Sequence, residues 1–148
     1  MIKIRGCSFP LDRYYHADYN VWVQPGANGV VTLGATSYGA ALAVEFFAFT
    51  PKAIGTKVDV GRAVGVLELS KTVVSVRAPV AGVVLEVNTA AVAKPEIIGA
   101  DPYGTGWLVQ LTAPWNETIA NCLLSEATLA PAFEAEMALE NFQGPLAI

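Results

Sequence analysis

One lysine stands in the middle of a long run of strand-forming residues. The segment from Gly65 to Asn88 reads GVLELSKTVVSVRAPVAGVVLEVN, and Lys71 is its only lysine, three residues after Glu68. A lysine at the tip of a hairpin extends its four-carbon stem into solvent, where another enzyme can acylate the ε-amine. A solvated charge that guards a hairpin is the simpler interpretation of a single lysine. The rest of the sequence distinguishes the two.

The residues on either side of the lysine favour a hairpin. Segments 64–69 and 72–78 are rich in valine and leucine, which is typical of β-strands. Pairing these two strands leaves Ser70 and Lys71 as the two residues of a tight turn. Rigid flanking strands would hold the lysine in one presentation while its side chain stays free.

The chain offers little for catalysis. His16 is the only histidine, and Cys7 and Cys122 lie far apart in the sequence, so a zinc site or a catalytic triad would have to be built around isolated residues. Reduced, partly buried thiols are the simpler interpretation of these cysteines. We therefore predict no metal, no catalytic residue and no enzymatic activity.

Composition and charge narrow the class further. The chain has 148 residues, of which 53% are hydrophobic and 15% charged, and this indicates a single folded domain over 1–148. A formal net charge of −4 argues against a nucleic-acid partner, because no basic surface is available to neutralise phosphates. The sequence shows no signal-peptide pattern and no apolar run long enough to span a membrane. We expect a cytoplasmic protein without a membrane partner.

Short strands separated by turns are followed by helices. This order predicts a mainly β fold class, with a β core over 14–112 and a C-terminal helical appendage over 113–148. The expected strands are 21–23, 30–33, 44–49, 64–69, 72–78, 83–87 and 107–111. The expected helices are 36–42, at most one turn near 94–99, 116–124, and a last helix from about 129–131 to 141 with Phe133, Met137 and Leu139 on its buried face.

The ordered motifs around Lys71 resemble the lipoyl-lysine hairpin of the glycine cleavage H-protein family. That family carries a glutamate three residues before its modified lysine, where Glu68 stands, and then a proline and a glycine, where Pro79 and Gly82 stand. Further matches follow in the family's order: Glu86-Val87-Asn88, Lys94-Pro95-Glu96, Asp101-Pro102-Tyr103-Gly104 and Gly106-Trp107-Leu108. The resemblance spans about residues 14–142 and includes Trp22-Val23, Val31-Thr32-Leu33-Gly34 and Thr36-Ser37-Tyr38 upstream.

The resemblance implies a fold, a cofactor and partners. The fold is a barrel-sandwich hybrid of the lipoyl and biotinyl carrier type, and the cofactor is lipoate in amide linkage to Lys71. Glu68 would belong to the surface that a lipoate ligase or lipoyl transferase reads, and oxidoreductase partners would load and unload the arm. Biotin carriers share the architecture but usually place methionine on both sides of the lysine, where this chain has Ser70 and Thr72.

Three residues depart from the pattern of the glycine system. Val21 and Ser75 stand where the family usually has carboxylates that help to hold the amine of an aminomethyl-loaded arm, and Arg77 adds a cation. This arm environment would favour an anionic adduct and make the protein a poor substrate for glycine decarboxylase. The segment from Arg5 to Tyr15 is similar to the start of lipoate-binding proteins of heterodisulfide-reductase-like sulfur oxidation, a branch of the same family.

Three functions stay open at this point. The preferred hypothesis is a lipoyl carrier of sulfur oxidation, whose swinging arm shuttles an intermediate between enzymes. The first alternative is an H protein of the glycine cleavage system, and the second is an unmodified interaction module that has the same fold.

Overall fold

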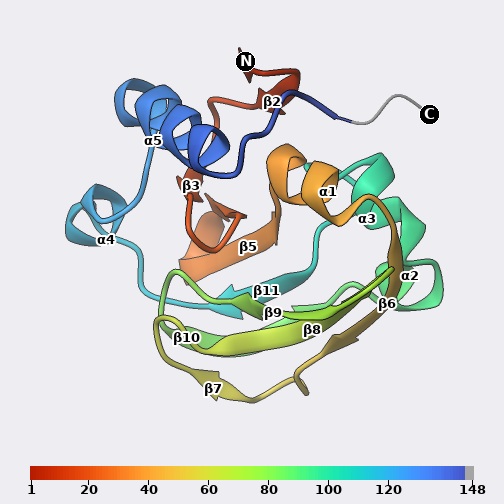
Figure 1. The fold of residues 1–148 in the computed structure, drawn as a ribbon. Coiled ribbons are helices and arrows are strands. Elements are labelled where there is room, and N and C mark those ends of the chain that lie inside the picture. The colour runs from red at the N-terminus through yellow and green to blue at the C-terminus, as the bar shows by residue number, and fades with distance from the viewer. Residues whose placement is uncertain (146–148) are drawn as a thin grey trace.

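The computed structural model describes residues 1–145 as strands and short helices (Figure 1). A six-stranded antiparallel sheet has the order β3-β4-β5-β11-β10-β7, a three-stranded sheet has the order β6-β8-β9, and β1 pairs with β2. The strands are β1 Ile2–Ile4, β2 Cys7–Phe9, β3 Tyr14–His16, β4 Val21–Pro25, β5 Val30–Ala35, β6 Phe46–Pro51, β7 Lys57–Val58, β8 Ala63–Leu69, β9 Val73–Arg77, β10 Gly82–Val87 and β11 Val109–Thr112.

The helices are short apart from the last one. They are α1 Ser37–Ala43, α2 Thr89–Ala93, α3 Glu96–Ala100, α4 Glu117–Asn121 and α5 Glu126–Leu139, and a 3-10 turn spans Ala27–Gly29. Thr36 caps α1 by accepting the amide hydrogen of Gly39, and Asn116 caps α4 by accepting that of Ile119. No helix of residues 1–145 is long and apolar enough to cross a membrane.

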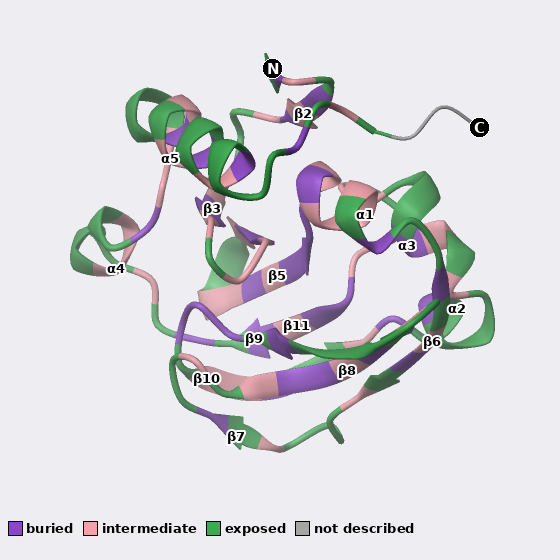
Figure 2. Ribbon diagram, viewed as in Figure 1, coloured by how far each residue is buried: buried purple, intermediate pink, exposed green. Residues whose placement is uncertain are grey.

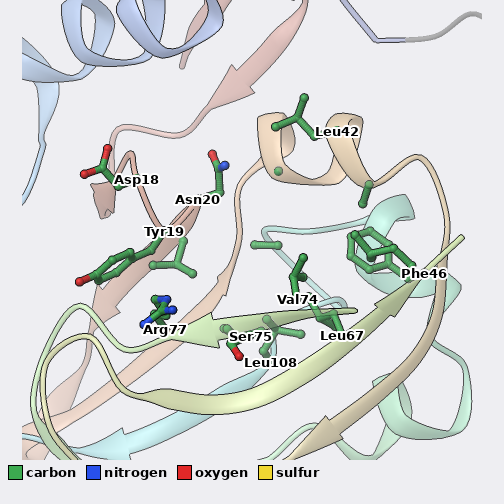
Figure 3. A pocket seen from close by; sticks show the side chains of 16 residues that line it. Asp18, Tyr19, Asn20, Leu42, Phe46, Leu67, Val74, Ser75, Arg77 and Leu108 are labelled. Atoms are coloured by element: carbon green, nitrogen blue, oxygen red, sulfur yellow. The ribbon is translucent and has the colours of Figure 1, made fainter. Parts of the chain in front are cut away.

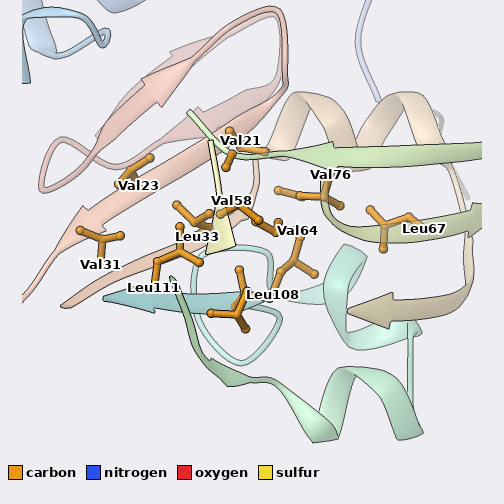
Figure 4. Packing of buried hydrophobic residues seen from close by; sticks show 14 of the residues in the cluster. Val21, Val23, Val31, Leu33, Val58, Val64, Leu67, Val76, Leu108 and Leu111 are labelled. Atoms are coloured by element: carbon orange, nitrogen blue, oxygen red, sulfur yellow. The ribbon is translucent and has the colours of Figure 1, made fainter. Parts of the chain in front are cut away.

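The two larger sheets face each other across one hydrophobic core. Valine and leucine side chains from β4, β5, β8, β9 and β11 meet there, together with Val58 of β7 (Figure 4). Alternation along the strands explains this packing, because every second side chain of a strand points to the same face. In β8, Gly65 and Leu67 are buried and Glu68 beside them is exposed, while a bulge between Ala63 and Gly65 turns Val64 into the core as well. Figure 2 shows that β8 carries buried residues, whereas β9 beside it is exposed over most of its length.

A second cluster lies on the other side of the six-stranded sheet. There α5 covers β1, β2, β3 and α1, and it contributes Leu129, Phe133 and Met137 as one buried stripe. The Phe133 ring lies 4.5 Å from that of Phe9, measured between ring centroids. The C-terminal helix is thus packed against the N-terminal strands.

Several motif residues have structural roles. Asn88 donates its side-chain amide to the carbonyls of Thr105 and Trp107 at 2.8 and 2.7 Å and also caps α2. A Cβ at Gly82 would lie 2.7 Å from the carbonyl oxygen of Thr112, so only glycine lets β10 and β11 approach this closely. Side chains that match the family's pattern therefore hold the loops together at a distance from the lysine.

The structure confirms the predicted hairpin around Lys71 and contains two strands, β3 and β7, that we did not predict. It differs from the prediction in four further places. Residues before Tyr14 form the β1–β2 hairpin, where we expected no strand, and a helix that we did not predict, α2, precedes α3. Val44 ends α1 and lies outside the strand that we began there. Helix α5 begins at Glu126, because Ser125 and Thr128 form a capping box, and it accommodates Pro131 in its interior.

Leu139 was wrongly placed on the buried face of the last helix. Its side chain is 81% exposed, whereas Phe133 and Met137 are buried as predicted. Leu139 follows Met137 by only two residues, which on a helix is more than half a turn around the axis. Residues 146–148 of the predicted appendage lie outside the described part of the chain.

Candidate functional site

Lys71 lies at the exposed tip of the β8–β9 hairpin. The Leu69 amide donates a hydrogen bond of 2.8 Å to the Thr72 carbonyl, which leaves Ser70 and Lys71 as the turn that we predicted. All three residues from Ser70 to Thr72 are exposed. Among the described residues, the Lys71 side chain has no salt bridge or hydrogen bond, so its amine is free to react.

The strands beneath the tip are firmly held. β8 pairs with β6 on one side and with β9 on the other, in registers that place Glu68 opposite Ala48 and opposite Val73. The Glu68 side chain is exposed and lies on the strand that leads to the turn, as the sequence indicated. β9 is an edge strand, because only β8 pairs with it.

A cleft of about 410 Å³ opens beside β9. One end is polar and is formed by Asp18, Tyr19, Asn20 and Arg77 (Figure 3). The other end is apolar and lies nearer the hairpin tip, where β9 begins. Its walls come from the β3–β4 turn, α1, β6, β8 and β9, and the apolar end includes Leu42, Phe46, Leu67, Leu69 and Val74.

The cleft brings together the three residues that we assigned to the arm environment. Val21, Ser75 and Arg77 all line it, and Lys71 and Glu68 do not. At about 3.3 Å per strand residue, Ser75 lies roughly 13 Å from Lys71 along the chain direction. Val21 is 2% exposed, so its side chain belongs to the core as much as to the cleft wall. Arg77 donates from Nη1 to the Gly61 carbonyl at 2.9 Å, which anchors its guanidinium at the polar end.

Three polar residues of the cleft were missed from the sequence. Asp18, Tyr19 and Asn20 reach it from the β3–β4 turn, more than fifty residues from the lysine. A left-handed backbone at Asn20, with φ of 53°, shapes this turn, and asparagine tolerates that conformation better than most residues. The run Asp-Tyr-Asn before a strand was the one signal in the sequence for such a turn.

Titratable groups behind the turn are perturbed. The His16 ring stacks on Tyr19, with centroids 3.7 Å apart, and its Nδ1 accepts the Tyr19 amide hydrogen. Burial lowers the pKa of His16, and the nearby Asp18 carboxylate partly opposes this shift. Burial, together with a hydrogen bond to Asp18, raises the pKa of Glu136 on α5.

The cysteines form no site. Cys7 is buried, and its burial raises the pKa of the thiol, which makes it less reactive. Cys122 is exposed, and its thiol donates to the Thr118 carbonyl at 3.4 Å. Residues 1–145 contain no cluster of three or more histidine, cysteine or acidic side chains that could hold a metal ion.

Comparison with known proteins places the chain in a family. The family model "Glycine cleavage H-protein" matches residues 13–136. "Glycine cleavage system H protein 5" of Aquifex aeolicus is 37% identical over 134 residues, which cover 88% of this chain and 89% of that protein. "Glycine cleavage system H protein 3" of the same organism is 39% identical over 117 residues, or 79% of this chain and 73% of that protein.

A solved structure agrees with the sequence relatives. The crystal structure of a glycine cleavage system H protein from Mycobacterium marinum superimposes with a TM-score of 0.68 at 34% identity, and the match covers 90% of this chain and 98% of that one. This similarity confirms the predicted barrel-sandwich fold of the lipoyl carrier type. The chain belongs to the glycine cleavage H-protein family.

Proposed function

We propose that this chain is a lipoyl carrier of the glycine cleavage type and that Lys71 holds its lipoate. Proteins of this family are carriers that hold lipoate covalently on a lysine. The observation that carries the proposal is the place of Lys71, which is exposed at the tip of a rigid hairpin and has no side-chain partner among residues 1–145. The adjoining cleft gives the arm a place to fold back. Lipoate attachment requires no catalytic residue of this chain.

The attachment is an ordinary acyl transfer to an amine. The neutral ε-amine of Lys71 attacks the carboxyl carbon of an activated lipoyl donor, such as the acyl adenylate that a lipoate ligase forms from ATP. A C–N bond forms, AMP leaves with the electron pair of the broken C–O bond, and the amine releases a proton to solvent. Lipoyl transferases would use a lipoyl thioester in the same way, with a thiol as the leaving group.

The modified arm then carries its cargo between enzymes. Lipoate on Lys71 would supply a disulfide whose reduction could be coupled to uptake of the aminomethyl group that glycine leaves after losing CO₂. Tethering keeps this group at a high effective concentration near each partner. The partners of this chain would therefore be a lipoate-attaching enzyme and the enzymes that load, unload and reoxidise the arm, in the cytoplasm.

The glycine cleavage function has better support than the sulfur-oxidation function that we preferred from the sequence. The family model and the relatives described above all carry glycine cleavage names. The lack of carboxylates at Val21 and Ser75 also counts for less than expected, because Asp18 brings a carboxylate to the polar end of the same cleft. A charged amine on the arm could approach that carboxylate, although Arg77 at the same end would oppose it.

The test has two stages. Intact-mass measurement of protein incubated with lipoate ligase, lipoate and ATP should show one added lipoyl group, which peptide mapping should place on Lys71. The lipoylated protein is then incubated with glycine and a glycine decarboxylase, and the aminomethyl adduct is measured by mass. Absence of lipoylation in the folded protein would favour the unmodified interaction module. Lipoylation without aminomethyl loading would return the sulfur-carrier alternative.

Substitutions in the cleft test whether its carboxylates affect aminomethyl loading in the second stage. Ser75→Asp adds a carboxylate at an exposed position of β9 and should increase aminomethyl loading, and Asp18→Asn should decrease it. The corresponding change at Val21 is a poor test, because a carboxylate there would be buried in the core and would destabilise the fold.

A further inference from the structure

The connection between α1 and β6 has a strained backbone. Val44 adopts φ of 65° and ψ of −59°, and the Glu45 amide donates to the Ala43 carbonyl at 2.7 Å. These values define a γ-turn of the rare, strained form with Val44 at its centre. A β-branched residue at positive φ is an outlier, and such a conformation persists only where the surrounding structure enforces it. Val44 nevertheless exposes 47% of its surface, so burial of its side chain does not explain why valine stands here.

A second exposed apolar residue, Phe47, follows three residues later. The pairing of β6 with β8 is interrupted by a bulge between Phe46 and Ala48, and Phe47 stands in that bulge with 56% of its surface exposed. Its two neighbours on β6 pair with Leu69 and Glu68, the last residues before the turn. Phe47 is therefore held next to the base of the hairpin tip. Bulges commonly redirect a side chain in this way.

We call Leu42, Val44, Glu45 and Phe47 the corner surface. It forms a ridge between two hollows, because Leu42 lines the cleft beside β9, while Val44, Glu45 and Phe47 line a second hollow of about 810 Å³. The second hollow lies between α1, the start of β6 and α3. Its charged groups among the described residues are two carboxylates, Glu45 and Glu96, and no cation lines it there.

We propose that the corner surface is the docking site for the enzyme that attaches lipoate to Lys71. The inference rests on the proposed function and names a further surface for its first step. The short distance between the Lys71 amine and the protein surface indicates which partner docks here. The attaching enzyme must bring its reaction centre to the amine of a lysine that does not yet carry lipoate. It therefore has to contact the protein surface that immediately surrounds the tip. Enzymes that act on the far end of the finished lipoyl arm can dock at a greater distance.

Chemistry defines the complementary surface on the partner. Three exposed apolar side chains call for an apolar recess that takes Phe47 and Val44, since buried aromatic anchors contribute most to interface affinity. The carboxylates of Glu45 and Glu96, with the exposed Glu68 beside the tip, call for basic residues around that recess. The strain at Val44 fits a surface that is kept for recognition and not for stability.

Two substitutions remove the surface without removing the fold. Phe47→Ser takes away the aromatic anchor from an exposed bulge. Val44→Gly takes away the second apolar side chain and also relieves the backbone, because glycine adopts positive φ at little cost. Leu139→Ser is the matched control, because it removes an even more exposed leucine from α5, far along the chain from the hairpin. Thermal unfolding confirms that each variant is folded.

The measurement is the kcat/KM for lipoylation of the unmodified protein by purified lipoate ligase with lipoate and ATP. We expect a decrease of roughly tenfold for Phe47→Ser and a smaller decrease for Val44→Gly, with Leu139→Ser equal to the wild type. Each variant, once fully lipoylated by prolonged incubation, should be loaded by glycine decarboxylase at the wild-type rate.

The outcomes separate this inference from the proposed function. Equal lipoylation rates for all variants would overturn the docking surface while leaving Lys71 as the lipoyl lysine. Normal lipoylation together with slow aminomethyl loading would overturn the choice of partner in favour of the decarboxylase. If the folded wild-type protein is never lipoylated, both the proposed function and this inference fail.

Discussion

The hairpin tip and the second hydrophobic cluster use their side chains in opposite ways. Around the tip, the hydrogen bonds that hold β6, β8 and β9 are formed by the backbone, and Lys71, Val73 and Phe47 remain exposed. In the second cluster the side chains bond to distant parts of the chain. The Tyr103 hydroxyl donates to the Ser8 carbonyl at 2.6 Å and accepts the Ser37 amide hydrogen.

The cluster also contains the best-enclosed cation of the chain. The Arg13 guanidinium lies over the rings of Trp22 and Tyr103, at 4.6 and 5.3 Å, and pairs with Asp12 at 2.9 Å. The comparison shows that different regions stabilise the fold and hold Lys71 in an exposed position. Backbone pairing makes the tip rigid, which leaves its side chains available for partners, while the second cluster holds the N-terminal strands and α5 against the sheet.

The largest expected effect is at the tip. Lys71→Arg keeps the charge but removes the acylable amine, so lipoylation should be lost completely while the melting temperature stays within 1–2 °C of the wild type, roughly as for other surface changes. Intact mass and thermal unfolding measure the two properties. A lipoyl group on another lysine of the variant would show that Lys71 is not the attachment site.

A substitution in the second cluster should do the reverse. Phe133→Ala removes a fully buried ring that contacts Phe9, Tyr15 and Tyr38, and it should lower the free energy of unfolding by about 3–5 kcal/mol. Urea denaturation measures this loss. At a temperature where the variant is folded, its lipoylation rate should equal that of the wild type. A parallel loss of both properties would mean that the two regions are coupled.

A smaller effect is expected for the carboxylate beside the tip. Glu68→Ala should slow lipoylation by roughly tenfold, which corresponds to about 1.4 kcal/mol, without changing stability. Glu86→Ala provides the control, since it removes another exposed strand carboxylate, on β10. A normal rate for the Glu68 variant would remove the recognition role that we predicted for this residue.

The smallest effect concerns pH and the turn beside the cleft. Burial keeps the pKa of His16 below its usual value of about 6.5 in the folded protein. The unfolded chain therefore takes up this proton first, and the free energy of unfolding should fall as the pH drops from about 7 through 6.5 toward the folded pKa. The loss develops while the pH falls between the unfolded and the folded pKa of this one histidine, and it levels off below the folded pKa.

The variant His16→Asn isolates this contribution. Asparagine keeps a side-chain acceptor near the Tyr19 amide but does not titrate. Urea denaturation at pH 5.5 and 7.5 should give a smaller difference for the variant than for the wild type. The same difference in both proteins would assign the pH dependence to other groups, such as Glu136, whose raised pKa acts in the opposite direction.

Sequence reasoning succeeded where a short stretch of chain specifies its own structure. The β8–β9 hairpin follows from strand-forming residues on both sides of a two-residue turn, and the helices expected near 36 and 116 begin there because Thr36 and Asn116 accept nearby amide hydrogens. It failed where the structure of a segment depends on packing against residues that are distant in the sequence. The β1–β2 hairpin lies against α5, which is far away in the sequence, and packing of Leu129 and Phe133 on either side of Pro131 keeps that residue inside the helix.

Some residues of the cleft were named from the sequence, as the environment of the arm, although the cleft itself was not predicted. Val21, Ser75 and Arg77 were found because the family pattern marks their positions, and they do converge. Asp18 and the apolar wall of α1 were missed, because their approach to β9 depends on how the two sheets face each other. No local periodicity in the sequence records that arrangement.

The free edge of β9 has a consequence for the behaviour of the protein in concentrated solution. Because Leu69 and Thr72 form the hydrogen-bonded pair that closes the hairpin, alternation turns the amide and carbonyl groups of Val73 and Ser75 outward, away from β8. Such an edge can template pairing between molecules, and charge near it is the usual protection. Lipoylation at Lys71 would remove the positive charge of this side chain and change the formal net charge from −4 to −5. Repulsion between the acidic molecules would then increase just when the charge near the edge of β9 is lost, and we expect this repulsion to oppose edge-to-edge pairing of the modified protein.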